Sequence, residues 1–312
     1  MRQLARQLAI TVMALLCARP AWAQWGVWAG DSLLAAGRLA SAESAYYAAA
    51  RARPRDPIVR TALGKFLAAR GGTRAGAVLL EEAQFFGGDS VSLARALVPL
   101  YERLGDFAAI DSLRPNVLMP GERRRARWLK ERPPQASLRD SVVLLTYRPV
   151  ADGQGFGIVL LRLGKTELPA MIDPRTSGLV VPAALRREMR TFGNDRGNDV
   201  AVADAVRIGG VVFSNVPTTI GSPDDKIRLG FHVLAPYSPS FDPRKGLMML
   251  RRPNRRTQPQ SGVRIPALFD TNGVRLLIAG HWQPSSAAMP AMLLATRAWT
   301  WDGKYGDVVL LP

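Results

Sequence analysis

Three glycines at an equal interval constrain the first third of the chain more than any other feature. Gly37, Gly71 and Gly105 are each 34 residues apart, and a fixed period of this length is typical of stacked helical pairs. In the first unit, Gly37 is followed by apolar and small residues at helical spacing. Pro54 then stands where a proline ends a helix, because it lacks an N–H and clashes with the preceding turn. The interval predicts helical hairpins between residues 25 and 118.

The residues around these glycines resemble the tetratricopeptide repeat (TPR) family. The resemblance implies a helical domain over residues 24–132 whose curved surface holds a peptide or partner chain, with Tyr46 and Tyr101 as candidate binding residues. Two alternatives stay open: an unrelated alanine-rich bundle, and a short array that only braces the domain after it. The matching positions, which become fewer toward Pro115, are Leu39, Ala42, Tyr46, Ala49 and Pro54 in the first unit, Leu63, Gly64, Leu80 and Ala83 in the second, and Tyr101 and Phe107 in the third.

The first residues have the pattern of a secretion signal. Arg2 and Arg6 precede an apolar run at residues 8–18 that is too short to span a bilayer, and Ala21 and Ala23 supply small residues before a cleavage point. We expect a signal peptide over residues 1–23, cleaved after Ala23, and a periplasmic or secreted mature protein without a membrane span. The alternative is an uncleaved anchor or a buried helix.

Several chemistries are disfavoured by composition. The single cysteine, Cys17, lies within the expected signal, so the mature chain has no thiol nucleophile and no disulfide. His232 and His281 stand far apart, without acidic or cysteine neighbours at metal-ligand spacing. Because phosphate-loop and dinucleotide motifs are also absent from the sequence, we expect no metal and no cofactor.

The chain is strongly basic, with a formal net charge of +17 that comes mostly from arginine. Such a charge favours polyanions. However, the arginines are spread along the chain and aromatic residues are not interleaved with them, so we expect no nucleic-acid partner. The densest run, at residues 123–132, predicts a helix with a solvated face.

After Pro133 and Pro134 the pattern changes from helical to strand-like. We expect a linker at residues 133–141, and then short strands with close turns, as in a barrel or sandwich. The expected strands are residues 142–147, 157–163 and 167–172, followed by hairpins at 204–217 and 240–250.

Four segments in this region resemble, in their order, the single-lobe retropepsin-like aspartic proteases. The resemblance implies an α+β chain in which the helices precede an all-β barrel lobe at residues 142–252. A linker at 253–263 and a C-terminal β extension at 264–312 would follow, and one interpretation of this extension is a vestigial second lobe. The four segments are the Asp-Thr-Gly-like residues 171–182, the hairpin at 208–217, the Leu-Gly segment at 227–234 and the aromatic-Asp turn at 241–250.

The chain departs from the family at the catalytic motif. Asp173 occupies the catalytic position, but Pro174 and Arg175 replace the threonine and glycine that follow it in the family. Aspartic proteases need two carboxylates that share a proton, and a fixed positive charge opposes that sharing. A second carboxylate would come from a homodimer mate or from Asp270, although Asp270 to Gly273 also fits an ordinary hairpin turn.

Two functional hypotheses follow. The first is a non-catalytic scaffold of the cell envelope that binds a peptide or protein segment in the helical groove and in the protease-like cleft. The alternative is an active aspartic peptidase that pairs Asp173 with the second carboxylate. In the first hypothesis the candidate binding residues of the cleft are Arg175, Thr176, Ser177 and Gly178.

Overall fold

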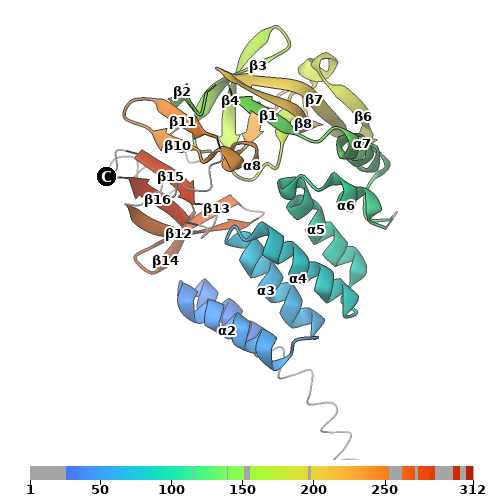
Figure 1. Ribbon diagram of the computed structural model, residues 1–312, viewed down its shortest axis with the longest axis vertical. Coiled ribbons are helices and arrows are strands. Elements are labelled where there is room, and N and C mark those ends of the chain that lie inside the picture. Colours follow the sequence, from blue (N-terminus) through green and yellow to red (C-terminus); the bar gives the residue numbers. More distant parts are fainter. Residues whose placement is uncertain are drawn as a thin grey trace, which may run out of the picture.

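A computed structural model describes residues 26–114, 116–138, 140–150, 155–195, 198–252, 262–270, 273–284, 298–302 and 307–311. The expected signal peptide and its cleavage point lie outside these residues. Helices form the first part of the chain and strands dominate the rest, which is an α+β arrangement (Figure 1). None of the helices in the described ranges is long and apolar enough to cross a membrane.

The helices form an antiparallel stack in which sequence neighbours pack on one another (Figure 1). Aspartate side chains cap three of them: the Asp56, Asp89 and Asp106 carboxylates accept backbone N–H bonds in the first turns of the helices that follow. The helices are one over 26–35, then α2 (Leu39–Ala52), α3 (Pro57–Ala69), α4 (Thr73–Phe85), α5 (Ser90–Leu104), α6 (Phe107–Ser112) and α7 (Pro120–Glu131).

The 34-residue interval has a backbone cause. Gly37, Gly71 and Gly105 have φ angles of 74°, 85° and 69°, and each follows the first helix of a pair. Only glycine adopts this left-handed conformation without a steric penalty. The recurring glycine therefore marks a recurring helix end. Membership of the TPR family stays a prediction.

The arginine-rich helix α7 has the expected exposed face. Several of its arginines nevertheless bind protein groups. Arg123 donates to the carbonyl oxygens of Asp111 and Leu113, each at 2.9 Å. Arg124 donates to the Phe192 carbonyl oxygen of the β region, and Arg125 donates to that of Thr218 at 3.4 Å. Composition alone does not reveal carbonyl acceptors that lie far away in sequence.

Sixteen strands occur among the described residues. β1 falls within the expected linker and pairs with β8. The strands are β1 (Gln135–Leu138), β2 (Val142–Arg148), β3 (Ile158–Leu163), β4 (Thr166–Asp173), β5 (Leu179–Val181), β6 (Arg190–Asp195), β7 (Asn198–Ile208), β8 (Val211–Ile220), β9 (Arg228–Gly230), β10 (Ser240–Asp242), β11 (Leu247–Arg251), β12 (Val263–Asp270), β13 (Gly273–Ile278), β14 (His281–Pro284), β15 (Ala298–Asp302) and β16 (Asp307–Leu311), with the short helix α8 (Phe231–Leu234) after β9.

Six of these strands close into a barrel. They pair in the order β3, β4, β9, β5, β8 and β7, and β7 pairs back with β3 through Val206 and Leu163. Side chains that alternate along the strands point inward, and Leu161, Ile172 and Leu229 are completely buried there. The barrel therefore has a filled core of its own.

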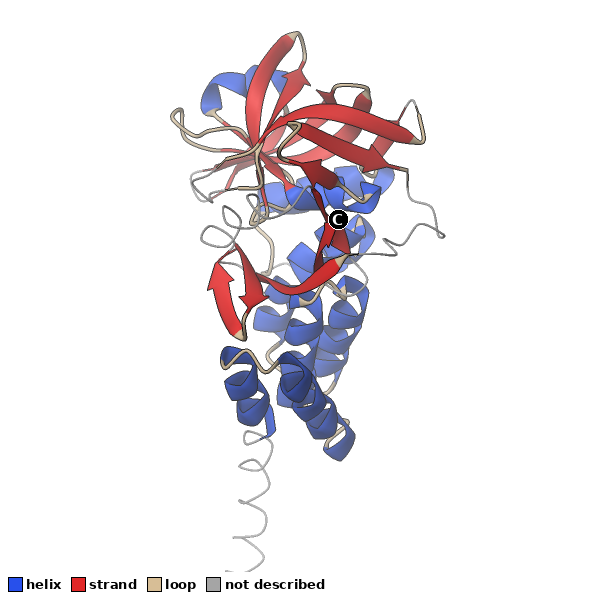
Figure 2. Cartoon of the chain, turned by 90° about the vertical axis from the view of Figure 1, so that its left-hand side faces the viewer, coloured by secondary structure: helices blue, strands red, loops and turns tan. Residues whose placement is uncertain are grey.

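The C-terminal strands extend the sheet from the barrel toward the helices. β15 pairs with β10, β16 with β15 and β12, and β13 and β14 continue the sheet to its edge. The Trp282 indole N–H donates to the Leu34 carbonyl oxygen, and Arg70 Nη1 donates to that of Ala267 at 2.7 Å. Figure 1 shows β13 beside the helical stack, and Figure 2 gives the view from the side.

Replacing Gly37 and Gly105 by alanine, one at a time, separates the effect of backbone strain from the effect of the close contact between Gly37 and Gly280. Both glycines are left-handed, so each Gly→Ala change should lower the free energy of unfolding by about 1–2 kcal/mol. A Cβ at Gly37 would also collide with the Gly280 carbonyl oxygen, whereas a Cβ at Gly105 meets nothing. We expect a larger loss for G37A than for G105A in urea unfolding, and faster proteolysis near Gly280. Equal losses would contradict the close contact.

Candidate functional site

Asp173 is the last residue of β4, at a point where three strands meet. β9 lies between β4 and β5, and Asp173 pairs with Gly230 of β9. The Gly230 N–H donates to the Gly178 carbonyl oxygen at 2.6 Å. A Cβ on Gly230 would collide with the Thr176 carbonyl oxygen. Residues 174–178, here called the Asp173 loop, are therefore packed directly against β9.

The Asp173 carboxylate is completely buried and is surrounded by donors. Arg175 donates its backbone N–H and its Nε–H to Oδ1, at 2.8 and 3.1 Å. The Thr176 hydroxyl donates to Oδ2 at 3.3 Å, and Arg228 Nη1 lies 3.7 Å from the same atom. Two guanidinium groups thus neutralise one carboxylate.

This arrangement opposes peptidase chemistry. An aspartic dyad needs a second carboxylate at hydrogen-bond distance and a shared proton. Among the described residues, the groups that hydrogen-bond or ion-pair with the Asp173 carboxylate are donors and cations. Asp270 ends β12 opposite Gly273, in the register of a tight hairpin, and its side chain lies outside the described residues.

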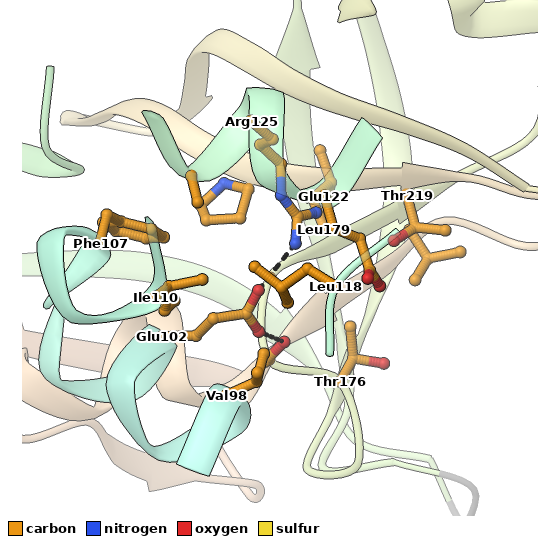
Figure 3. A pocket seen from close by; sticks show the side chains of 15 residues that line it. Val98, Glu102, Phe107, Ile110, Leu118, Glu122, Arg125, Thr176, Leu179 and Thr219 are labelled. Carbon is orange, nitrogen blue, oxygen red and sulfur yellow. Dashed lines mark hydrogen bonds and ion pairs between the residues drawn. The ribbon is translucent and has the colours of Figure 1, made fainter. Parts of the chain in front are cut away.

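The other side of the Asp173 loop contacts the helices. The Ser177 hydroxyl donates to Glu102 Oε2 of α5 at 2.9 Å. Arg125 Nη2 of α7 donates to Glu102 Oε1 at 2.7 Å, and both side chains of this ion pair are mostly buried. A cavity of about 190 Å³, here called the Glu102 cavity, lies between the loop, α5, α6 and α7. In Figure 3 the Glu102–Arg125 ion pair crosses it.

The predicted binding residues fall into two groups. Thr176, Ser177 and Gly178 line the Glu102 cavity, whereas Arg175 binds Asp173. The two tyrosines lie elsewhere, among the helices. Tyr46 is buried, donates to Asp31 and packs 4.9 Å from the Phe66 ring. Tyr101 is buried and donates to Glu81 at 2.9 Å, so both tyrosines serve helix packing.

Three residues of the site were not among the predicted ones. Arg228 lies in the Leu-Gly segment of the family resemblance, and the parallel pairing of β9 with β4 brings it to Asp173. Glu102 and Arg125 carry no such signal, because Glu102 bonds a residue 75 positions away. Contacts of this kind depend on how the helices dock on the barrel.

A half-buried histidine, whose Nε2 atom is fully buried, lies between the helices and the barrel. His232 of α8 packs 6.0 Å from the Phe269 ring, and its Nε2 has no hydrogen-bond partner among the described residues. Burial, and secondly the charge of Arg103 on α5, lowers the pKa of His232 to about 3. Within the described ranges, histidine, cysteine and acidic residues form no cluster of three that could hold a metal.

The comparisons with known proteins give distant similarities to solved structures. No protein-family model matches the sequence, and no curated protein matches it. Among solved structures, the chain is similar to the crystal structure of a retropepsin-like aspartic protease from Rickettsia conorii, with 16% sequence identity and a TM-score of 0.27. The match covers 38% of this chain and 93% of that chain.

Arg228→Met tests how much the ion pair between Arg228 and the buried Asp173 carboxylate contributes to the free energy of unfolding. The change should lower the free energy of unfolding by about 2–3 kcal/mol, because Arg175 is then the one cation left to offset the desolvation of the buried carboxylate. Lys245→Met is the control: its ion pair with Asp242 is 3.8 Å long and Lys245 is 74% exposed, so the loss should stay within about 0.5 kcal/mol. Urea unfolding measures both, and equal effects would contradict the proposed dependence.

His232 predicts a loss of stability in acid. Its pKa is about 3 in the folded protein, against the ordinary histidine value of 6.5, so between these values the unfolded chain binds a proton that the folded one does not. Stability from this group is complete above pH 6.5 and falls as the pH drops toward 3. His232→Leu should flatten the dependence of the unfolding free energy on pH in this window. His281→Leu, at an exposed position, should leave it unchanged; equal slopes for wild type and H232L would refute the assignment.

Proposed function

We propose that the chain is an exported, non-catalytic binding protein of the cell envelope. In this proposal a retropepsin-like β domain and a TPR-like helical array together hold a peptide or protein segment. The observation that carries the proposal is the state of Asp173: its carboxylate is buried under Arg175 and Arg228, while the Glu102 cavity lies beside the same loop.

The non-catalytic part rests on charge. A catalytic aspartate must hold or share a proton and contact the attacking water. Asp173 is 0% exposed and already accepts hydrogen bonds from Arg175 and Thr176. Those bonds occupy the oxygens that would otherwise contact the water.

The binding part rests on the construction of the cavity. Its walls come from helices and strands that are fixed by ion pairs and hydrogen bonds, namely Glu102 with Arg125 and Glu102 with Ser177. Rigid walls reduce the entropy lost when a ligand binds. The combination of apolar walls with a few polar groups is typical of ligand sites.

The alternative, an active peptidase, needs a second carboxylate beside Asp173. In a homodimer the Asp173 loop would have to face the second copy. Here Ser177 of that loop is bonded to α5, and Thr176 and Gly178 border the helices. A second copy of the chain would have to displace these contacts, and this requirement favours the binding function.

Export is the remaining part of the proposal. It rests on the signal-like pattern at residues 1–23. A periplasmic or secreted location would suit a chain whose one cysteine lies in that segment.

A cleavage assay with the matched Asp173→Asn variant tests the proposal. The full mature chain is incubated with an unfolded protein substrate between about pH 3.5 and 7, a range that spans the ordinary titration of carboxyl groups, and products are identified by mass spectrometry. We expect no cleavage above the buffer control with either protein, because Asp173 is neutralised by cations. Acid-dependent cleavage by the wild type that disappears in D173N would overturn it.

A further inference from the structure

We infer that Arg103 and His232, here called the Arg103 site, bind a single carboxylate group where the helices meet the barrel. The carboxylate would belong to an acidic side chain of a bound peptide or to a free small carboxylate. This inference rests on the proposed binding function and names the chemistry that the ligand would present. It is carried by two buried nitrogen atoms without partners and by the charge around them.

The Arg103 guanidinium has unused donors. Arg103 is half-buried near the end of α5 and its Nε atom is fully buried, yet it forms no hydrogen bond and no ion pair with any described residue. Glu102, its neighbour in the chain, already uses its two carboxylate oxygens for Arg125 and Ser177. An arginine keeps its charge in proteins, and a charge withdrawn from water without a partner carries a penalty that an anion would offset.

His232 supplies a second nitrogen. Its Nε2 atom is fully buried and has no hydrogen-bond partner among the described residues. Burial, and secondly the charge of Arg103, lowers the pKa of His232 to about 3, so the imidazole is neutral near pH 7. One ring nitrogen of a neutral imidazole carries a proton, and in the Nε2–H tautomer this side chain donates toward an anion.

The Arg103 site adjoins the Asp173 loop. Glu102, directly before Arg103, accepts the hydrogen bond of Ser177. Gly230, two residues before His232, donates its N–H to the Gly178 carbonyl oxygen. A ligand at the Arg103 site would therefore contact the same junction of helices and barrel that the proposed function uses.

The charge of the site selects a carboxylate. One guanidinium beside a neutral imidazole has a single positive charge, which a monoanion neutralises, whereas a phosphate dianion would leave an unbalanced charge in a half-buried place. The planar guanidinium also matches the two oxygens of a carboxylate. The rings of Phe231 and Phe269 lie 6.4 and 6.0 Å from that of His232, and such apolar surroundings strengthen the attraction between opposite charges.

Histidine NMR signals of the full mature chain test the inference, because the chain has only two histidines. The probes are Ala-Ala-Glu-Ala-Ala with blocked termini, the same peptide with glutamine, which keeps the shape and lacks the charge, and sodium acetate. We expect the glutamate peptide to shift the His232 signals and to bind about tenfold more tightly than the glutamine peptide. The signals of His281, which is exposed, should not move.

Arg103→Met identifies the site. Methionine keeps an unbranched stem and removes the donors, and no ion pair is lost with them. We expect R103M to weaken binding of the glutamate peptide about tenfold and to leave binding of the glutamine peptide unchanged. R103K, which keeps the charge without the planar fork, should weaken it less. Arg95→Met, at an exposed position of the same helix, changes the net charge equally and should have no effect.

The remaining outcomes separate the ligand sources and the two proposals. Tighter binding of the glutamate peptide than of acetate would assign the site to a peptide side chain, and equal affinities would assign it to a free small carboxylate. Equal binding of both peptides, or no shift with any probe at millimolar concentration, would refute the carboxylate inference. So would an equal loss in R103M and R95M. Cleavage of either peptide, detected by mass spectrometry, would instead overturn the proposed function.

Discussion

The buried Asp173 carboxylate is the constraint on which the site depends. Removing a carboxylate from water carries a large penalty unless donors and cations replace the lost hydration. Arg175, Thr176 and Arg228 supply that replacement, and in doing so they fix the Asp173 loop against β9. The fixed loop then presents Ser177 to α5. The contacts of one buried residue therefore contribute to how the barrel meets the helices.

Features that depend on local backbone chemistry could be predicted from the sequence. The glycine interval predicted helical pairs, whose first helices end in left-handed turns. The apolar run at residues 167–172 predicted a strand, which the structure extends to Asp173. Contacts between distant segments could not be predicted. β1 lies after two prolines that signalled a linker, and it is a strand only because β8 offers it an edge. Glu102 and Arg125 belong to the site only because the helices dock on the barrel.

Arginine has a structural role in this chain that its net charge conceals. A guanidinium group has five donors in a planar fork, which suits it to several carbonyl oxygens at once. Arg123 uses this geometry to hold the segment between α6 and α7, Arg124 to hold Phe192, and Arg70 to hold Ala267. These arginines thereby join segments of the protein at helix ends and sheet edges.

The contact between Trp282 and Leu34 joins residues 248 positions apart. Contacts of such separation form late, since a long loop must close before they contribute to stability. The first helical pair is thus completed by strands near the end of the chain. During synthesis or export from the N-terminus, the helical stack would emerge before β12–β14, so the helix surface that these strands contact would be uncovered. The stack would reach its final state only after nearly the whole chain had followed.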